Sequence, residues 1–274
     1  MKRALLLLSL VVGLVVVGES RGGGPVPLIA AHRGGAGLWP EASLLAFRNA
    51  VALGVDYLEF DLHLTADGEV VVIHDATLDR TTTARGAVRE VTRADLAAAR
   101  IRARDGSVTD EPVPTFAQVL ELAAPTPVEV LPEIKAGPER RRYEGIEEKV
   151  LALLRLHGML KRSTVQAFDP ETIHRLRALE PSVRTMLLVG AAGVKRAKAR
   201  PAEAVGWARD AGATDLGMDH HLIDASVVAA ARKAKIRLSA WTVNEEADLR
   251  RMLDVGVDVV MTDYPDLAKQ LLGR

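Results

Sequence analysis

The sequence has no cysteine among its 274 residues, so it forms no disulfide and offers no cysteine for an amino-terminal lipid anchor. Aromatic residues are scarce at 4%, and thirty-six basic residues balance thirty-six acidic ones. The lack of net charge excludes the global electric field that attracts nucleic acid or an anionic membrane surface. The composition of the whole chain, with 48% hydrophobic and 26% charged residues, is that of an ordinary globular protein.

Long apolar runs are missing too, apart from one at the amino terminus. Lys2 and Arg3 precede an uncharged, largely apolar stretch over residues 4–17, which predicts an export signal over residues 1–20 with cleavage after Ser20. A spanning helix needs roughly 20 apolar residues, so the stretch is short for a permanent anchor, although an uncleaved signal anchor stays open. We therefore expect a periplasmic or extracellular protein with one folded domain over residues 26–274.

After this segment, short β-branched runs alternate with longer segments of helical period. Residues 143–158 are typical of the helical segments, because Tyr143, Ile146 and Val150 share one face with Leu153. Strands are expected at residues 27–34, 56–64, 128–135, 163–168, 184–189, 214–219, 237–243 and 258–263. Strands that alternate with helices in this number predict an α/β protein with a (β/α)8 TIM-barrel fold.

A short pattern recurs in "GVDYLEFD", "GATDLGMD" and "GVDVVMTD", where a glycine stands seven positions before an aspartate. The glycine suits the left-handed residue that ends a helix, and the aspartate then lies at the carboxyl end of the next strand. These aspartates are Asp61, Asp219 and Asp263. Taken singly, Asp219 and Asp263 are interpreted as ordinary loop residues.

Two features interrupt the alternation of strand and helix. An Asp-Gly turn at residues 67–68 predicts a hairpin, in which residues 70–73 pair back onto the preceding strand and return His74 toward it. Residues 78–114 are rich in Arg, Thr and Asp, and we expect them to form an insertion over the mouth of the barrel. Its one short helical piece lies in residues 92–100, where Thr92 is expected to cap and Asp95 to complete a capping box.

Side chains suited to one site stand at the carboxyl ends of several predicted strands, and these ends meet at one face of a barrel. They are His32, Arg33, Glu59, Asp61, His74, Glu133 and Lys135. Crowded carboxylates suit a hard divalent ion, so we predict one Ca²⁺ or Mg²⁺ ion between Glu59 and Asp61, with Glu133 as a third ligand. Each residue alone fits an exposed strand carboxylate, a structural histidine or a surface cation, and only their coincidence indicates a site.

The stretch "AHRGGAGLWPEASLLAFRNAVALGVDYLEFDLHLTADGEVVVIHDATLDRTT" closely resembles the amino-terminal signature of the glycerophosphodiester phosphodiesterases. "PTFAQVLELA", "PEIK", "QAFD", "AWTVN" and "GVDVVMTDYPD" match later blocks of that family in order. The resemblance covers nearly all of the chain after the predicted signal. It implies a TIM barrel that hydrolyses glycerophosphodiesters to sn-glycerol 3-phosphate and an alcohol, with a small-molecule substrate and one divalent metal ion.

The resemblance also implies a role for each site residue. Glu59, Asp61 and Glu133 hold the metal, and His32 and His74 form the acid and base pair; Arg33 and Lys135 contact the phosphate, Glu41 orients Arg33 or a histidine, and Phe168 and Trp241 line the glycerol side of the pocket. In this family the neighbouring glycerol hydroxyl attacks the phosphorus, and water then opens the cyclic phosphate. Many members read Pro-Glu-Asn-Thr where this chain has Pro40, Glu41, Ala42 and Ser43; Ser43 keeps a hydroxyl that can cap the following helix.

Two alternatives stay open at this point. A related phosphodiesterase acting on lysophospholipids or other lipids would use the same residues, with a wider and more apolar entrance supplied by residues 78–114. A non-catalytic envelope binding protein would fit the export signal, but the complete set of site residues argues against it. We expect no nucleic-acid partner, and membrane contact only through a retained signal or a lipid-like substrate; the sequence leaves the oligomeric state open.

Overall fold

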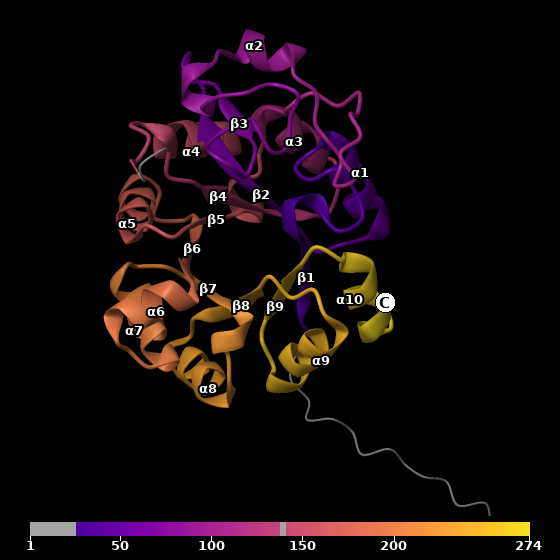
Figure 1. Cartoon of the computed structure of the whole chain (residues 1–274). Coiled ribbons are helices and arrows are strands. Elements are labelled where there is room, and N and C mark those ends of the chain that lie inside the picture. The colour runs from indigo at the N-terminus through magenta and orange to yellow at the C-terminus, as the bar shows by residue number, and fades with distance from the viewer. Residues whose placement is uncertain (1–25, 138–140) are drawn as a thin grey trace, which may run out of the picture.

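Eight parallel strands close into a barrel surrounded by helices in the computed structural model, which describes residues 26–137 and 141–274 (Figure 1). The strands are β1 (Leu28–Ala31), β2 (Tyr57–Leu64), β4 (Glu129–Ile134), β5 (Thr164–Ala167), β6 (Arg184–Val189), β7 (Asp215–Asp219), β8 (Arg237–Trp241) and β9 (Val259–Thr262). The ring closes because β1 pairs with both β2 and β9. The predicted TIM-barrel fold is confirmed.

Helices cover the outside of this ring, apart from one short helix in the insertion over residues 78–114. They are α1 (Leu44–Leu53), α2 (Arg93–Ala98), α3 (Phe116–Ala123), α4 (Ile146–Leu156), α5 (Pro170–Leu179), α6 (Ala191–Ala197), α7 (Ala204–Asp210), α8 (Ala225–Ala234), α9 (Glu246–Val255) and α10 (Pro265–Leu272). Short 3₁₀ turns lie at η1 (His32–Gly34), η2 (Val88–Glu90), η4 (Leu160–Arg162), η5 (Pro201–Glu203) and η6 (His220–Leu222). None of the helices in the described ranges is both long and apolar enough to cross a membrane.

The ends of α1 follow from two residues noted in the sequence. The Ser43 hydroxyl accepts a hydrogen bond from the Ala46 amide at 3.0 Å, so the expected cap forms although the family's Asn-Thr pair is absent. Gly54 ends the helix with a φ of 79°, a left-handed conformation that favours glycine. By contrast, α4 begins only at Ile146, so Tyr143 lies before the helix rather than on its face.

Successive side chains of β2 point alternately outward, toward the core under the helices, and inward, toward the centre of the barrel. Leu58, Phe60 and Leu62 pack outward against the helices, where the Phe60 ring lies 5.5 Å from the ring of Phe47 and 5.8 Å from that of Phe116 between centroids. Residues at the intervening positions of β2 face into the barrel. The barrel interior is filled by a smaller set of apolar side chains: Ala30, Tyr57, Leu131, Met186, Leu188, Val259 and Met261.

The predicted hairpin forms as β3 (Val70–Val72), which pairs antiparallel with β2 in the register His63 to Val71. Residues 78–114 then leave the barrel and include α2, where Thr92 and Asp95 make the expected capping box. They also contain η2, which the sequence did not predict. The apolar side chains of this insertion form a separate cluster with Val71 and Ile73 of the hairpin; they are Leu78, Val88, Leu96, Ile101 and Val113. The predicted export signal lies outside the described residues.

Candidate active site

Three buried carboxylates meet at the carboxyl end of neighbouring strands. Glu59 and Asp61 lie two positions apart on β2, and Glu133 stands opposite Asp61 in the register of β2 with β4. Their side chains are buried, and one carboxylate oxygen from each lies within 4.8 Å of the others. The structure therefore brings the three predicted metal ligands together.

The charges around these carboxylates are only partly compensated. Lys135 Nζ lies 3.0 Å from Glu133 Oε1 and 3.2 Å from Asp61 Oδ1. Burial raises the pKa of Glu59 and of Glu133, and the negative charge of Asp61 raises both further. Burial also acts against ionisation of Asp61, but Lys135 and the other nearby cationic groups outweigh it and lower the pKa of Asp61. Fully ionised, the three carboxylates would carry three negative charges against the single charge of Lys135, and the raised pKa values of Glu59 and Glu133 reflect this excess and their burial.

A divalent cation fits this arrangement. Asp61 Oδ2 is buried and accepts no hydrogen bond from any residue in the described ranges. Glu59 is held by the Arg33 amide at 2.9 Å and by the Gln166 side-chain amide at 2.9 Å, so its orientation is fixed before any ion binds. Oxygen ligands of this kind are those that Ca²⁺ and Mg²⁺ take. The carboxylates of Glu59, Asp61 and Glu133 could therefore hold one metal ion.

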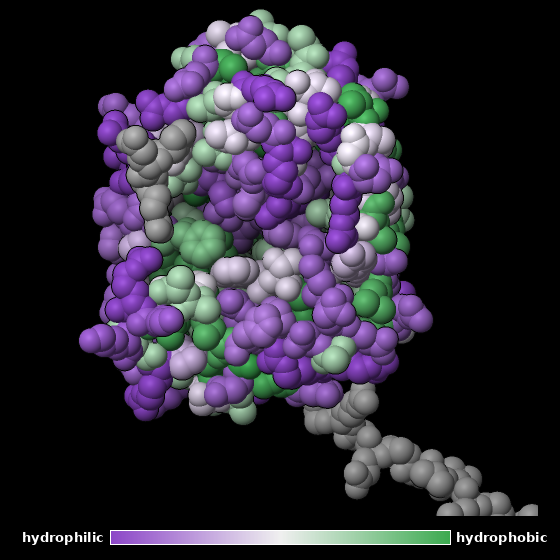
Figure 2. Space-filling model, in the orientation of Figure 1, coloured by the Kyte–Doolittle hydropathy of each residue, from purple (hydrophilic) through white to green (hydrophobic). Residues whose placement is uncertain are grey.

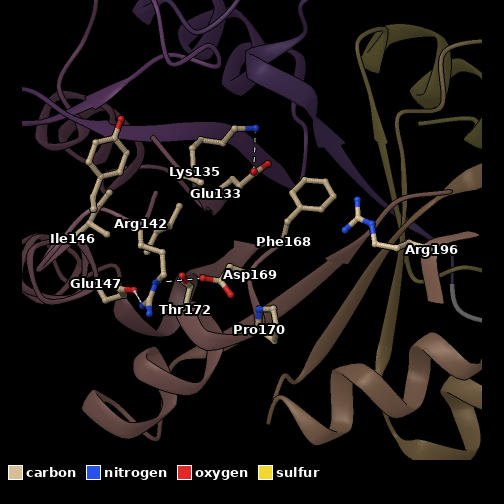
Figure 3. A pocket seen from close by; sticks show the side chains of 13 residues that line it. Glu133, Lys135, Arg142, Ile146, Glu147, Phe168, Asp169, Pro170, Thr172 and Arg196 are labelled. Atoms are coloured by element: carbon tan, nitrogen blue, oxygen red, sulfur yellow. Dashed lines mark hydrogen bonds and ion pairs between the residues drawn. The ribbon is translucent and has the colours of Figure 1, made fainter. Parts of the chain in front are cut away.

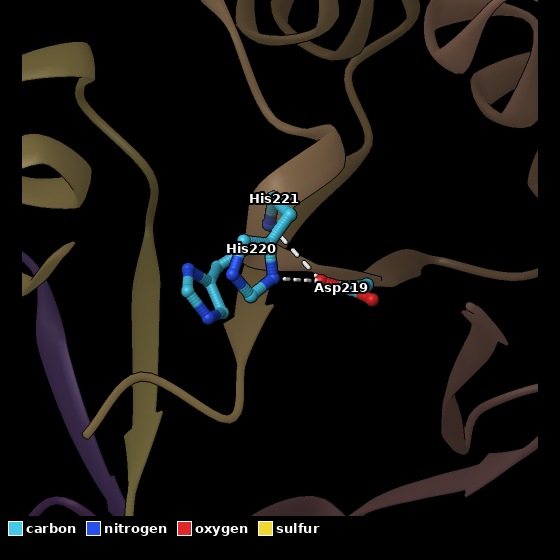
Figure 4. Close-up of side chains that lie close together, drawn as sticks. All are labelled: Asp219, His220 and His221. Atoms are coloured by element: carbon cyan, nitrogen blue, oxygen red, sulfur yellow. Dashed lines mark hydrogen bonds and ion pairs between the residues drawn. The ribbon is translucent and has the colours of Figure 1, made fainter. Parts of the chain in front are cut away.

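A second group, Asp219, His220 and His221 at the end of β7, also brings possible ligand atoms within 4.8 Å of one another (Figure 4). The possible ligand atoms of this group already make hydrogen bonds within the protein. The Asp219 carboxylate accepts from the His221 amide and ring Nδ1, at 3.0 and 2.9 Å, and caps η6. The Nδ1 atom of buried His220 lies 3.0 Å from the guanidinium of Arg251, a cation that disfavours a metal ion there. Asp219 is the last residue of β7 and not a loop residue, and its hydrogen bonds to His221 are local to η6.

His32 lies at the end of β1 with one ring nitrogen directed at a carboxylate on each side. Nδ1 donates to Asp263 Oδ1 at 2.6 Å, and Nε2 lies 3.9 Å from Glu59 Oε2. Asp263 is itself held by the side-chain amide of Asn244 at 2.7 Å. Burial lowers the pKa of His32, but the negative charge of Glu59 and the bond to Asp263 outweigh burial, so the pKa is raised.

His74 follows β3 and has a similar partner. Its Nδ1 lies 2.6 Å from Asp75 Oδ1, and Asp75 accepts from Arg80 Nε at 2.7 Å. Burial and the positive charges of Lys135 and Arg33 lower the pKa of His74, although Asp61 opposes them. Each candidate catalytic histidine therefore has a carboxylate that fixes its ring and its tautomer.

His63 fixes the backbone at His74. Its Nε2 donates to the His74 carbonyl at 3.1 Å, so its Nδ1 must accept the hydrogen bond from the Tyr143 hydroxyl at 2.8 Å. Burial lowers the pKa of His63 to about 4, which agrees with a neutral ring making these two bonds. The hairpin that carries His74 is thus attached to β2 by a side chain as well as by strand pairing.

Arg33 and Lys135 supply the fixed positive charge of the site. Arg33 has a φ of 50°, in the left-handed region, which lets its backbone amide point at Glu59 while its side chain runs to Glu41. Arg33 Nη1 donates to Glu41 Oε1 at 3.1 Å, and Glu41 also binds Arg80 through two bonds of 2.8 Å. Glu41 therefore contacts Arg33, and in the part of the chain that the structure describes it is linked to His74 through Arg80 and Asp75.

A small cavity of about 120 Å³ is lined by the three carboxylates, by His32 and His74, and by Arg33 and Lys135. Its apolar wall includes Phe168 and Trp241, whose rings meet edge to face with centroids 5.6 Å apart. Phe168 also borders a neighbouring pocket of about 620 Å³, where it lies beside Glu133 and Lys135 with Arg196 approaching from the other side (Figure 3). Figure 2 shows this face hollowed near its centre, with hydrophobic residues on one side of the hollow and hydrophilic ones around it.

The structure places nine of the ten predicted site residues in the lining of this cavity, and Glu41 beside it. Sequence reasoning missed the groups behind them: Asp75, Arg80, Asp263, Asn244, His63 and Gln166. The interpretation of Asp263 as an ordinary loop residue was wrong, because it pairs with His32 across 231 positions of sequence. Its place at the end of a strand was the one available signal.

Replacing Asp263 by asparagine is expected to lower kcat by about 10- to 100-fold, in the range of a lost charge-assisted hydrogen bond. The reason is that His32 loses the partner that fixes its ring, while the carboxylate cluster is untouched. Steady-state kinetics together with metal-induced thermal stabilisation measure both effects, and we expect KM and the stabilisation to stay near wild type. Asp266→Asn, an exposed neighbour on α10, is the matched control. Loss of metal-induced stabilisation in Asp263→Asn would contradict a role through His32.

The chain is similar to known proteins along most of its length. The model of the glycerophosphoryl diester phosphodiesterase family matches residues 32–267. A glycerophosphodiester phosphodiesterase of Bacillus subtilis is 33% identical over 257 residues, covering 88% of this chain and 84% of its own. A solved structure from Agrobacterium tumefaciens, described provisionally as a glycerophosphoryl diester phosphodiesterase, superposes with a TM-score of 0.83. The two chains are 30% identical, and the match covers 90% of this chain and 98% of the other.

A third similar structure is that of an Oleispira antarctica phosphodiesterase, described as a complex with the product sn-glycerol 3-phosphate. It covers 91% of this chain and 98% of its own, with a TM-score of 0.77. At 23% identity it bears on the fold alone.

Proposed function

The chain belongs to the glycerophosphoryl diester phosphodiesterase family, and from this premise we propose that it hydrolyses glycerophosphodiesters to sn-glycerol 3-phosphate and an alcohol by histidine acid–base catalysis at a divalent metal. Membership makes it a glycerophosphodiester phosphodiesterase that acts on a small glycerophosphodiester substrate. The observation that carries the proposal is one cavity holding three buried carboxylates together with two histidines, each paired with an aspartate.

The metal is proposed to be one Ca²⁺ or Mg²⁺ ion held by Glu59, Asp61 and Glu133. When bound, such an ion supplies positive charge to a nonbridging oxygen of the phosphodiester. The guanidinium of Arg33 and the ammonium of Lys135 lie beside the same carboxylates, at 3.8 Å and 3.2 Å from Asp61 oxygens. We assign both side chains to the phosphate, where their charge offsets the negative charge that develops in the transition state.

His32 and His74 are proposed to move the protons. One imidazole accepts the proton of the glycerol hydroxyl that attacks phosphorus, and the other donates a proton to the departing alkoxide. The bond from phosphorus to the alcohol breaks as the ring of the cyclic phosphate closes, and water then opens that ring with the proton transfers reversed. Asp263 and Asp75 keep the two rings oriented through both steps.

The glycerol is proposed to lie against Phe168 and Trp241. The cavity of about 120 Å³ has room for a group of this size, and the edge-to-face rings give it a flat apolar wall on one side. The sn-glycerol 3-phosphate described in the Oleispira antarctica structure is the product that we propose for this chain.

A lipid substrate has less support. The alternative needed an apolar entrance supplied by residues 78–114, yet most large apolar side chains of this insertion, such as Leu78, Leu96 and Ile101, are buried in its own cluster, and Val108 is a single exposed one. The insertion instead lines the neighbouring space with arginines. We also propose export to the periplasm or the exterior, on the strength of residues 1–20 alone.

A screen of phosphodiesters tests the proposed function. Glycerophosphocholine, glycerophosphoethanolamine and glycerophosphoglycerol are each incubated with the enzyme and Ca²⁺, Mg²⁺ or chelator, and free sn-glycerol 3-phosphate is followed. We expect release from all three with a divalent ion, and much slower release of alcohol from a lysophospholipid with the same head group. Faster turnover of the lysolipid would support the lipid alternative instead.

A further inference from the structure

A second pocket of about 530 Å³ opens beside the proposed catalytic cavity and shares His32 and Arg33 with it. Its two walls come from distant parts of the chain. Residues 80–81 and 102–104 of the insertion form one wall, and residues 244–245 with 263–264, from the loops after β8 and β9, form the other. The two pockets therefore meet at His32 and Arg33.

Four arginines line the pocket against three carboxylates, and the carboxylates are largely engaged. Glu41 is bound by Arg33 and Arg80, and Asp263 is bound by His32 and Asn244. The donors of Arg80 are in turn taken up by Asp75 and Glu41.

Of the four arginines in the lining, Arg102 and Arg104 are left to consider. Arg102 donates through Nε to the Thr82 carbonyl at 3.0 Å, and Arg104 donates through Nη1 to the Tyr264 hydroxyl at 2.8 Å. Within the described ranges, neither guanidinium is in an ion pair with a carboxylate. These two bonds orient the side chains without neutralising them, so the pocket holds two positioned cations.

Tyr264 is fixed in place by its packing against Gly37. A β-carbon at Gly37 would lie 2.4 Å from Cε1 of the Tyr264 ring, so only glycine allows the ring to lie against the backbone there. The hydroxyl that accepts from Arg104 therefore has a defined position, and this hydrogen bond orients the exposed side chain of Arg104.

We propose that this pocket binds a second anionic group, a phosphate or a carboxylate, carried by the alcohol that the enzyme releases, through Arg102 and Arg104. The proposal rests on the proposed hydrolysis and adds the class of alcohol. Guanidinium groups bind such anions through paired, charge-assisted hydrogen bonds. The enzyme then favours diesters whose alcohol is itself acidic over diesters of neutral or cationic alcohols.

Glu245 is the one feature of the pocket that argues for a different alcohol. It is exposed at the outer rim and is in no ion pair with another described residue. A cationic head group such as choline would be attracted by Glu245 and repelled by Arg102 and Arg104. Since two guanidinium groups face one carboxylate, we expect repulsion to win, and glycerophosphocholine is included in the test for this reason.

The test compares three substrates by initial rates of sn-glycerol 3-phosphate release, expressed for each scissile bond. They are 1,3-bis(sn-glycero-3-phospho)glycerol, whose leaving alcohol carries a second phosphodiester anion, and glycerophosphoglycerol and glycerophosphocholine, whose alcohols are neutral and cationic. We expect kcat/KM to be at least about tenfold higher for the first, mainly through a lower KM, and the preference to weaken as salt is raised. In the double variant Arg102→Gln/Arg104→Gln this preference is expected to disappear.

The control is Arg196→Gln, which removes one of the same guanidinium charges at the pocket on the other side of Phe168. It is expected to leave the substrate preference at the wild-type value. Equal kcat/KM for all three substrates in the wild type, a preference for glycerophosphocholine, or loss of the preference in Arg196→Gln instead of the double variant would each overturn the proposal. If none of the substrates is hydrolysed, the proposed function fails as well; if glycerophosphoglycerol is turned over without discrimination, only the second anion site fails.

Discussion

Replacing His32 or His74 by alanine is expected to lower kcat by about 10²- to 10⁴-fold, the usual contribution of a positioned acid or base. Each ring lies in the cavity that contains the carboxylate cluster, and each has its outer nitrogen bound to an aspartate, so the inner nitrogen is the one that faces the substrate. We expect the two single variants to lose activity to a similar degree, because acid and base act in the same step. Steady-state kinetics on glycerophosphoglycerol measure the loss.

The fold should survive both changes. The His32 side chain is 15% exposed and that of His74 is 31% exposed, so neither belongs to the apolar core. Circular dichroism and thermal unfolding check this point. His221→Ala removes an exposed histidine from the same end of the barrel and is expected to keep wild-type kcat. A kcat near the wild-type value in His32→Ala or His74→Ala would remove that residue from the mechanism.

Removal of divalent ions is the second change with a large expected effect. Excess chelator should reduce turnover to background, and added Ca²⁺ or Mg²⁺ should restore it, because three buried carboxylates otherwise repel the phosphodiester. Binding should also raise the melting temperature. An ion at about 100 times its dissociation constant stabilises the fold by about 2.7 kcal/mol, which corresponds to roughly 5–10 °C for a domain of this size. Activity and thermal shift are measured on the same preparation.

The variant Glu133→Gln distinguishes a loss of metal binding from a loss of fold stability. Burial already opposes the ionisation of Glu133 and raises its pKa, so its negative charge costs stability increasingly as the pH rises through that pKa. The amide removes this cost, and the metal-free variant is expected to melt no lower than metal-free wild type at pH 8. It should nevertheless lose activity and the metal-induced shift. Asp219→Asn, in the second cluster, should retain both; full activity of the wild type in excess chelator would contradict the carboxylate site.

Much of this architecture was readable from the sequence because the barrel repeats one local rule. Most strands were short apolar runs followed by a helical segment, and the structure places the strands within one or two residues of the prediction at most ends. Residues that fit no such rule were harder. Tyr143 was assigned to the face of a helix by periodicity, yet the helix begins at Ile146 and Tyr143 serves His63.

The site was partly predictable for a related reason. Carboxylates, histidines and cations at strand ends could be grouped because the fold brings strand ends together. Asp263 and Asp75 could not be assigned as histidine partners, since that role depends on the direction of side chains from β9 and from the loop after β3. Arg102 and Arg104 lie in an insertion without a periodic pattern, and their approach to His32 is visible only in three dimensions.

The position of His74 in the fold determines how the enzyme is expected to lose activity on heating. His74 alone among the proposed catalytic and metal-binding residues follows a strand outside the eight-stranded ring, and it is tied to the small apolar cluster of the insertion through Val71 and Ile73. Val70 and Val72 of the same strand pack in the main core, so β3 joins two apolar clusters. Local opening of the insertion cluster would remove the packing on one side of the strand that carries His74 while its pairing with β2 stays intact, and heat inactivation would then precede global melting.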